Sequence, residues 1–374
     1  MLILLYIGTI LYAFVGKKQK FFWIWCSLLF VLITNTSIGY ADFDGYELYY
    51  NSVTSGVMDI NYMGMSKGWY YLCLFFSKVG LSYRGMTAVL IVVSCYLINL
   101  FLKKTKCNQK IFWGLFVIFP GIIQLVQLRF FFGTSIVFFG LFFILDLRKD
   151  GIKSTIMGLI KFTICVLLAY YIHSSCIIFI MYVFVPLFDR IGQKKTIFIF
   201  IISSLLLSTF VPRLTSIIEI FVSQEKFTRY FESSISETTL TWFMQILFVW
   251  IFCLIVCYYC NKEYRITMLK VENKSVIFTE AFGIRILTCV SLLCFTLPFL
   301  SFDRNFHRFL EIGYMLVYVY ISVIWHNSKI ELKNKYILLS IFVGIILIIT
   351  YIYTPYLTVI KPFFEFSGFH SLIR

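Results

Sequence analysis

The chain alternates long apolar runs with short polar breaks from one end to the other. A helix needs about 20 predominantly apolar residues to cross a membrane, and backbone groups in lipid must bond to one another, which favours helices. We therefore predict an all-α polytopic integral membrane protein that forms a single transmembrane domain over residues 1–374. About twelve transmembrane helices are expected, near residues 2–16, 21–39, 85–102, 111–127, 130–147, 154–171, 174–188, 196–212, 242–260, 275–300, 309–325 and 336–353.

One apolar segment does not fit this series. Trp69–Ser82 is short and carries Lys78, and counting it as a crossing would invert every later loop. We interpret it as a re-entrant or interfacial helix on the outer face. The stretches Tyr40–Ser66 and Arg213–Thr241 are interpreted as long outer loops, and everything on the cytoplasmic side is short.

Composition and charge support a membrane protein and set its orientation. Hydrophobic residues make up 60% of the chain and charged residues 14%, with a mean hydropathy of +0.88, which excludes an ordinary soluble domain. The net charge of +15 does not indicate nucleic acid, because Lys and Arg fall in short clusters between apolar runs. Such clusters mark cytoplasmic loops, so both termini are expected outside and the first apolar run is expected to stay uncleaved.

Once the basic clusters are placed in the cytoplasm, several polar residues come out together on the outer face. Arg129 and His173 each interrupt an apolar run, and Phe302–Arg308 lies between two more. Our central hypothesis is that these breaks form one polar site. Arginines bind phosphate oxygens in a bidentate manner, and a histidine near neutral pKa can move a proton. The alternative is that these residues are only interfacial anchors.

Acidic and aromatic residues follow the second apolar run. Asp44 could act as a general base toward a sugar hydroxyl, while Tyr46 and Tyr49 stack on or bind the sugar; the alternative is a solvated loop. Arg285 lies inside a predicted span far from the outer residues, so a structural role is favoured. Cys257 and Cys260 form a C-x-x-C, but the cysteines lie mostly in apolar runs and are interpreted as small hydrophobes. We expect no metal site and no cofactor.

Five segments, in order, resemble a known family. They are DFDGYELYY, SKGWYYLCLFFSKVGLSY, QLRFFFGTSIVFFG, YYIHSSCIIFIMYVF and DRNFHRF. This order resembles that of the EpsG/Wzy-type bacterial polysaccharide polymerases. The positions that match are Asp44, Tyr46 and Tyr49, then Gly68 to Tyr83, then Arg129, then His173 with Ser175. The chain departs from the family pattern at Lys67, where an acid is common, and it has no arginine at the end of the span before Asp44.

The resemblance implies an integral-membrane glycosyltransferase related to the GT-C class. Such an enzyme would extend an O-antigen, capsule or exopolysaccharide from undecaprenyl-diphosphate-linked oligosaccharides on the outer face of the bacterial cytoplasmic membrane. Arg129, His173 and Asp44 are the expected catalytic residues. The expected substrate-binding residues are Arg304, His307, Arg308, Tyr46 and Tyr49. Expected partners are the lipid-linked oligosaccharide, the bilayer, and flippase and chain-length regulator proteins, with no nucleic acid.

Three other functions stay open at this point. A transporter or flippase for lipid-linked sugars would also be polytopic and basic, although transporters generally place ionisable residues near the membrane midplane. A ligase, or a glycosyltransferase that uses a polyprenyl-phosphate sugar, would share the outer Arg and His residues. A structural partner in an envelope assembly would not need those residues.

Overall fold

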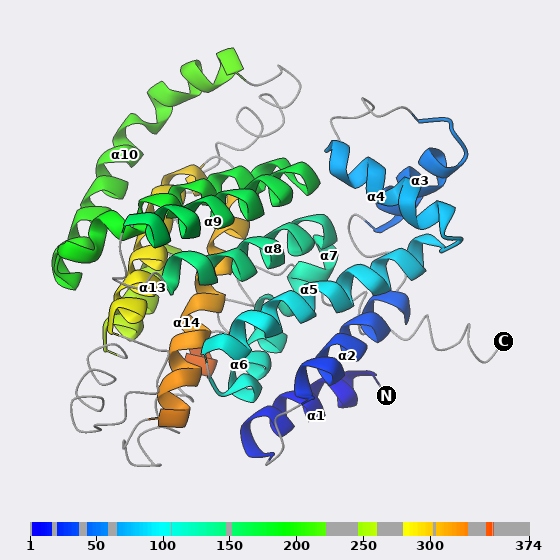
Figure 1. Cartoon of the computed structure of the whole chain (residues 1–374), viewed down its shortest axis with the longest axis horizontal. Helices are drawn as coiled ribbons and strands as arrows, with labels where there is room; N and C mark the ends of the chain where they lie inside the picture. The colour runs from blue at the N-terminus through cyan, green and yellow to red at the C-terminus, as the bar shows by residue number, and fades with distance from the viewer. Residues whose placement is uncertain are drawn as a thin grey trace. The chain divides into compact units, whose positions relative to one another are not determined.

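A computed structural model describes most of the chain. The described residues are 2–16, 21–36, 43–58, 66–105, 107–146, 152–221, 246–259, 280–301, 304–327, 342–345 and 347. Every regular element within these ranges is helical (Figure 1). The chain forms two compact units, unit 1 with Met1–Val183 and Lys329–Arg374, and unit 2 with Phe184–Ser328. The single transmembrane domain stays a prediction.

Unit 1 contains a bundle of antiparallel and parallel helices. Its elements are α1 (Leu2–Val15), α2 (Phe22–Thr36), α3 (Phe43–Thr54), α4 (Lys67–Lys78), α5 (Tyr83–Thr105), α6 (Gln109–Phe116), η2 (Val117–Gly121), α7 (Ile122–Val126), α8 (Leu128–Leu145), α9 (Ile152–Ile172) and the first part of the 3-10 helix η3 (Ser174–Arg190). The short helices α3 and α4 lie together at one end of the bundle, beside the start of α5 (Figure 1). We call this the capped end.

The opposite end of unit 1 carries lysines, and we call it the lysine end. The Lys104 ammonium lies 4.0 Å from the centroid of the Phe142 ring, and Lys161 lies 5.6 Å from that of Phe143. At the capped end, an Arg84 guanidinium nitrogen donates to the Asn35 carbonyl at 2.6 Å, which joins the end of α2 to the start of α5. The lysines in the last turn of α5 therefore lie at the end of α8 opposite Arg129, which is consistent with the predicted charge pattern.

Glycines let α8 and α9 pack closely along their length. A Cβ added at Gly133 would lie 2.7 Å from the Cys176 sulfur, and one at Gly140 would lie 2.7 Å from the Cys165 Cβ. Real Cβ atoms do not approach so closely, so a larger residue at either position would require neighbouring atoms to shift. The Cys176 sulfur belongs to η3, and the added Cβ at Gly133 would also lie 3.5 Å from the Ala169 carbonyl oxygen of α9. Because Gly133 and Gly140 are seven residues apart, they share one face of α8. This contact fixes the start of α8 against the end of α9.

The helical stretch Gln109–Val126, which lies between α5 and α8 in the chain, is interrupted near its middle. Phe119 and Pro120 have non-helical backbone angles within η2, and the break is buried. Proline lacks the N–H that continues a helix, so carbonyl groups one turn earlier are released. The Tyr6 hydroxyl of α1 donates to the Val117 carbonyl at 2.7 Å and satisfies one of them. A side chain from the first helix thus stabilises the break.

Unit 2 contains the end of η3 together with α10 (Gln193–Phe221), α13 (Glu280–Leu292), η5 (Leu293–Ser301), η6 (Arg304–His307) and α14 (Arg308–Asn327), and an apolar helix at Ile246–Tyr259. Its core includes the edge-to-face pair of Trp250 and Tyr314, with ring centroids 5.3 Å apart. Gly313 lies under the same indole, because a Cβ added there would clash with the Trp250 ring.

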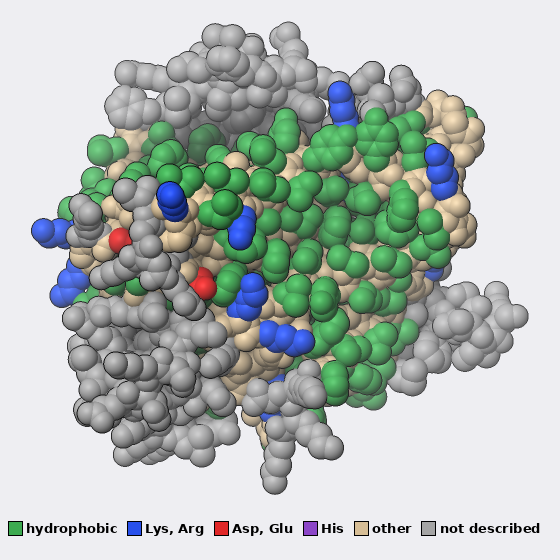
Figure 2. Space-filling view, in the orientation of Figure 1, with side chains coloured by type: hydrophobic (Ala, Val, Ile, Leu, Met, Phe, Trp, Pro, Cys, Tyr) green, Lys and Arg blue, Asp and Glu red, His purple; other side chains and the backbone are tan. Residues whose placement is uncertain are grey.

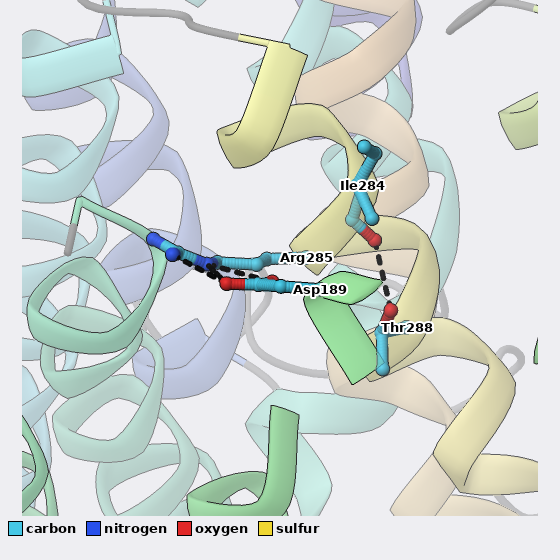
Figure 3. A network of polar contacts seen from close by, with 4 residues as sticks. All are labelled: Asp189, Ile284, Arg285 and Thr288. Carbon is cyan, nitrogen blue, oxygen red and sulfur yellow. Dashed lines mark hydrogen bonds and ion pairs between the residues drawn. The ribbon is translucent and has the colours of Figure 1, made fainter. Parts of the chain in front are cut away.

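A bidentate ion pair is buried in unit 2. The Arg285 Nε lies 3.0 Å from each Asp189 carboxylate oxygen, and its Nη2 lies 2.6 Å from Oδ2 (Figure 3). The Arg285 side chain is 7% exposed and that of Asp189 is 29% exposed. The structural role favoured for Arg285 is therefore confirmed. It joins α13 to the last turn of η3.

Helix lengths support an integral membrane protein. Five helical stretches within the described residues are long and apolar enough to span a membrane, at Tyr83–Thr105, Gln109–Val126, Leu128–Leu145, Lys153–Ile172 and Ala281–Leu300. Hydrophobic side chains cover a broad area of the face in Figure 2. On α9, Ile156, Ile160, Ile164 and Leu167 are 47–52% exposed and follow one helix face, as expected of lipid-facing residues. The count of twelve and the relation to the GT-C class stay predictions.

Two predicted outer loops were partly wrong. Tyr40–Ser66 contains α3, because Phe43, Tyr50 and Val53 recur at helical spacing and are buried. Arg213–Thr241 begins with the last turns of α10, which continue to Phe221. By contrast, α4 has 12 residues and is about 18 Å long, which is too short to cross a bilayer. This length is in line with a re-entrant or interfacial helix at Trp69–Ser82. The predicted span 336–353 lies largely outside the described residues.

Candidate active site

The capped end of unit 1 brings together three of the residues singled out from the sequence. Arg129 lies in the first turn of α8, and its guanidinium carbon is 5.1 Å from the centroid of the Tyr46 ring of α3 and 6.0 Å from that of the Trp69 ring of α4. Tyr46 and Trp69 contact each other, with centroids 6.1 Å apart. The electron-rich ring faces attract the guanidinium and hold it between α3 and α4.

His173 lies at the same end of the bundle. It occupies the single position between α9 and η3 and is 9% exposed. Its ring packs edge to face on Phe130, the residue after Arg129, with centroids 5.4 Å apart. A Cβ added at Gly133, one turn further along α8, would lie 3.8 Å from the His173 Cβ. His173 therefore lies beside the first turns of α8, the helix that begins with Leu128 and Arg129. That the two residues form one polar site stays a prediction.

The short helix α4 is held against the end of α9 by a close backbone approach. A Cβ added at Gly68 would overlap the Tyr171 carbonyl oxygen, so no other residue fits there without moving the helices apart. Tyr71 and Tyr171 stack with ring centroids 6.4 Å apart. This contact sets the position of Trp69, the next residue, relative to Arg129.

Tyr49 lies on the buried side of α3. It is 2% exposed, and burial raises its pKa to about 12, with the nearby Cys73 adding to this rise and the Arg129 charge opposing it. The neighbouring Tyr50 donates from its hydroxyl to the Leu81 carbonyl at 2.6 Å and so ties α3 to the start of α5. Burial also raises the pKa of Cys73 to about 12, so this thiol stays protonated.

Asp44 is placed differently. It lies in the first turn of α3, where a negative charge is favourable, and its side chain is exposed. Its catalytic role stays a prediction.

The remaining predicted substrate-binding residues lie in unit 2. Arg304 begins η6, and Arg308 begins α14 and is partly exposed. The His307 Nε2 lies 3.6 Å from a carboxylate oxygen of Glu311, whose side chain is fully buried. Glu311 was missed by the sequence analysis, although its place four residues after a histidine is a signal for such a pair. That these residues share a site with Arg129 stays a prediction.

Comparison with known families gives one decisive result. A sequence profile of the EpsG family matches residues 19–366. The chain belongs to the EpsG family. Comparisons with curated proteins and with solved structures give no match. Membership of the EpsG family suggests a polysaccharide polymerase and confirms the resemblance drawn from the five ordered segments.

The capped end combines a cation with aromatic rings and a nearby histidine. It offers a fixed cation, aromatic surfaces of the kind on which sugar rings stack, and a histidine at a helix end. No group of three or more His, Cys, Asp or Glu side chains suitable for a metal ion occurs in the described ranges. The ten cysteines that the structure describes are buried thiols, and Cys260 lies outside the described residues.

Proposed function

We propose that this EpsG family protein polymerises lipid-linked oligosaccharide repeat units on the outer face of the bacterial cytoplasmic membrane. The substrate is an undecaprenyl-diphosphate-linked oligosaccharide, and the product is a capsule, O-antigen or exopolysaccharide. One observation carries the proposal. At the capped end of unit 1, Arg129 contacts the rings of Tyr46 and Trp69, and His173 packs on the neighbouring residue Phe130. This end lies away from the lysines of unit 1.

The reaction joins two lipid-linked chains. A hydroxyl of the acceptor unit attacks the anomeric carbon of the growing chain, and the bond from that carbon to the phosphate oxygen breaks. The electron pair leaves with the diphosphate. Arg129 stabilises the negative charge that collects on this leaving group, and the N-terminus of α8 adds to the effect. Arg304 and Arg308 are further candidates for the same task, and His307 for binding.

The attacking hydroxyl must lose a proton. His173 is the proposed acceptor because its imidazole can take up a proton near neutral pH. Asp44 is the second candidate. The polyprenyl diphosphate leaves with the electron pair, and His173 later releases the proton to water or to the diphosphate, so atoms and charge balance without a nucleotide or a metal ion. A flippase would supply the substrate, and a chain-length regulator would act on the product.

A transporter of lipid-linked sugars is the second candidate function. The observation that favours it is the buried break in the span Gln109–Val126, since interrupted helices often form transport sites. The two functions differ in what accumulates when the gene is deleted. Loss of a polymerase leaves single repeats that reach the outer face, whereas loss of a transporter leaves them on the cytoplasmic face.

The test is a deletion strain examined in two ways. A ladder gel of surface glycan reports chain length, and a membrane-impermeant glycan-modifying enzyme added to whole cells reports the face on which single lipid-linked repeats reside. Single repeats accessible from outside are the expected result. Repeats accessible only after the cells are opened would refute the polymerase and support the transporter.

A further inference from the structure

Two hydrogen-bond donors are buried beside Arg129. The Trp69 indole nitrogen and the Tyr49 hydroxyl have almost no exposed surface, and neither has a hydrogen-bond partner among the residues that the structure describes. A buried donor left without a partner costs about 1–3 kcal/mol. Such groups are uncommon in native proteins and need an explanation.

Burial alone does not distinguish a ligand site. The indole nitrogen of Trp113 is also buried without a partner within the described ranges. Trp113 packs edge to face on Phe112 and Phe116, and its surroundings are apolar core. Trp69 differs because its ring lies against the Arg129 guanidinium and the Tyr46 ring. The second donor, Tyr49, lies on α3 three residues after Tyr46, whose ring the Arg129 guanidinium contacts, so the two tyrosines share one side of the helix.

Arg129, Trp69 and Tyr49 can all donate hydrogen bonds. Arginine and the indole nitrogen can only donate, and the tyrosine hydroxyl can donate while it is protonated. The raised pKa of Tyr49 keeps that proton in place at every physiological pH. A site made of donors from α3, α4 and the first turn of α8 suits a ligand made of acceptors, and above all anionic oxygens.

We propose that Trp69 and Tyr49 donate hydrogen bonds to the diphosphate of a polyprenyl-diphosphate substrate whose charge is balanced by Arg129. The inference rests on the proposed function and deepens it, since it assigns neutral donors to the leaving group in addition to the cation. Because both donors are closed off by α3 and α4, the diphosphate reaches them only when these two short helices move relative to α8. In that state, Arg129 contacts the diphosphate in place of the Tyr46 and Trp69 rings.

The test measures binding to the purified full-length protein in phosphatidylcholine nanodiscs. The probes are a polyprenyl diphosphate, the matching polyprenol, and phosphatidylglycerol as a common anionic lipid. The variants are W69F and Y49F, which remove one donor each and keep an aromatic ring. The matched controls are W113F, which removes a similar indole from the core, and Y50F, which removes a hydroxyl that already has a partner.

The two kinds of variant should separate binding from stability. W69F and Y49F should each weaken diphosphate binding by about ten-fold or more, as expected for a hydrogen bond to a charged group. Neither should lower the melting temperature of the ligand-free protein, because no hydrogen bond is lost there. W113F should leave binding unchanged, and Y50F should lower the melting temperature with little effect on binding.

Each other outcome has a definite meaning. Unchanged affinity in W69F and Y49F would overturn the inference and leave the polymerase proposal standing. Equal binding of polyprenol or phosphatidylglycerol by the unaltered protein would also overturn it, since the site would then not select a diphosphate. Weakened binding in both variants, together with full-length surface polymer in a strain that lacks the gene, would support the diphosphate site and refute the polymerase.

Discussion

The ion pair of Asp189 and Arg285 allows a sharp test of what holds unit 2 together. Removing one partner of a buried pair leaves an uncompensated charge and costs about 3–5 kcal/mol. The two partners differ in exposure, at 29% for the Asp189 side chain and 7% for that of Arg285. Water can therefore reach a lone Asp189 carboxylate more easily than a lone Arg285 guanidinium.

This asymmetry predicts the order of the variants. Arg285→Met should cost about 3 kcal/mol, at the low end of that range, and Asp189→Leu should cost more. At roughly 2–4 °C for each kcal/mol, Arg285→Met should lower the melting temperature by about 6–12 °C. The double variant should be more stable than Asp189→Leu alone, because it leaves no buried charge.

The assay is thermal unfolding of the purified protein in one detergent, followed by the fraction that stays monodisperse after heating. A control is Thr288→Val, which replaces a hydroxyl one turn along α13 by a methyl group; that hydroxyl donates to the Ile284 carbonyl of the same helix (Figure 3). Strictly additive losses in the double variant would show that the pair contributes no coupling energy and would refute the reasoning. So would equal stability of all variants.

Three further predictions concern the capped end and its support. Gly68→Ala should abolish long polymer on a ladder gel or strongly shorten it, because the new Cβ would overlap the Tyr171 carbonyl oxygen. Gly45→Ala is the control, since a Cβ there meets open space, and it should leave the ladder unchanged. Equal ladders from the two variants would contradict the role of the Gly68 contact. Gly140→Ala should lower stability by about 1–3 kcal/mol in the detergent assay, and an unchanged melting temperature would show that α8 and α9 adjust freely. His173→Gln should leave single lipid-linked repeats with normal membrane insertion, and long polymer in that strain would remove His173 as the proton acceptor.

The placement of Arg129 and His173 at helix ends away from Lys104 could be predicted from the apolar runs and the basic clusters between them. Basic clusters at one side of each crossing fix which helix ends meet, and the broad topology of unit 1 follows from them. The contact of the guanidinium with Trp69 could not be predicted, because it depends on how far α4 folds back over α8. That in turn depends on the fit of Gly68 against Tyr171.

The misses have physical reasons as well. The segment of α3 reads as a loop because Asp44, Glu47 and several tyrosines lower its hydropathy, although its buried positions follow a helical period. Arg285 could be interpreted as structural, but its partner lies 96 residues away and only the folded chain brings the two together. The helix break near Pro120 was hidden because the flanking residues are uniformly apolar.

The central claim is that Arg129 stabilises the departing diphosphate, and one measurement tests it most directly. A strain without the gene is complemented with the unaltered protein, with Arg129→Ala, or with Lys161→Met. Lys161→Met is the control, because it removes a cation whose ammonium lies at the lysine end. Surface glycan from strains with matched protein levels in the membrane is then separated on a ladder gel. The account predicts long chains with the unaltered protein and with Lys161→Met, and only single repeats with Arg129→Ala. A full ladder with Arg129→Ala would contradict it.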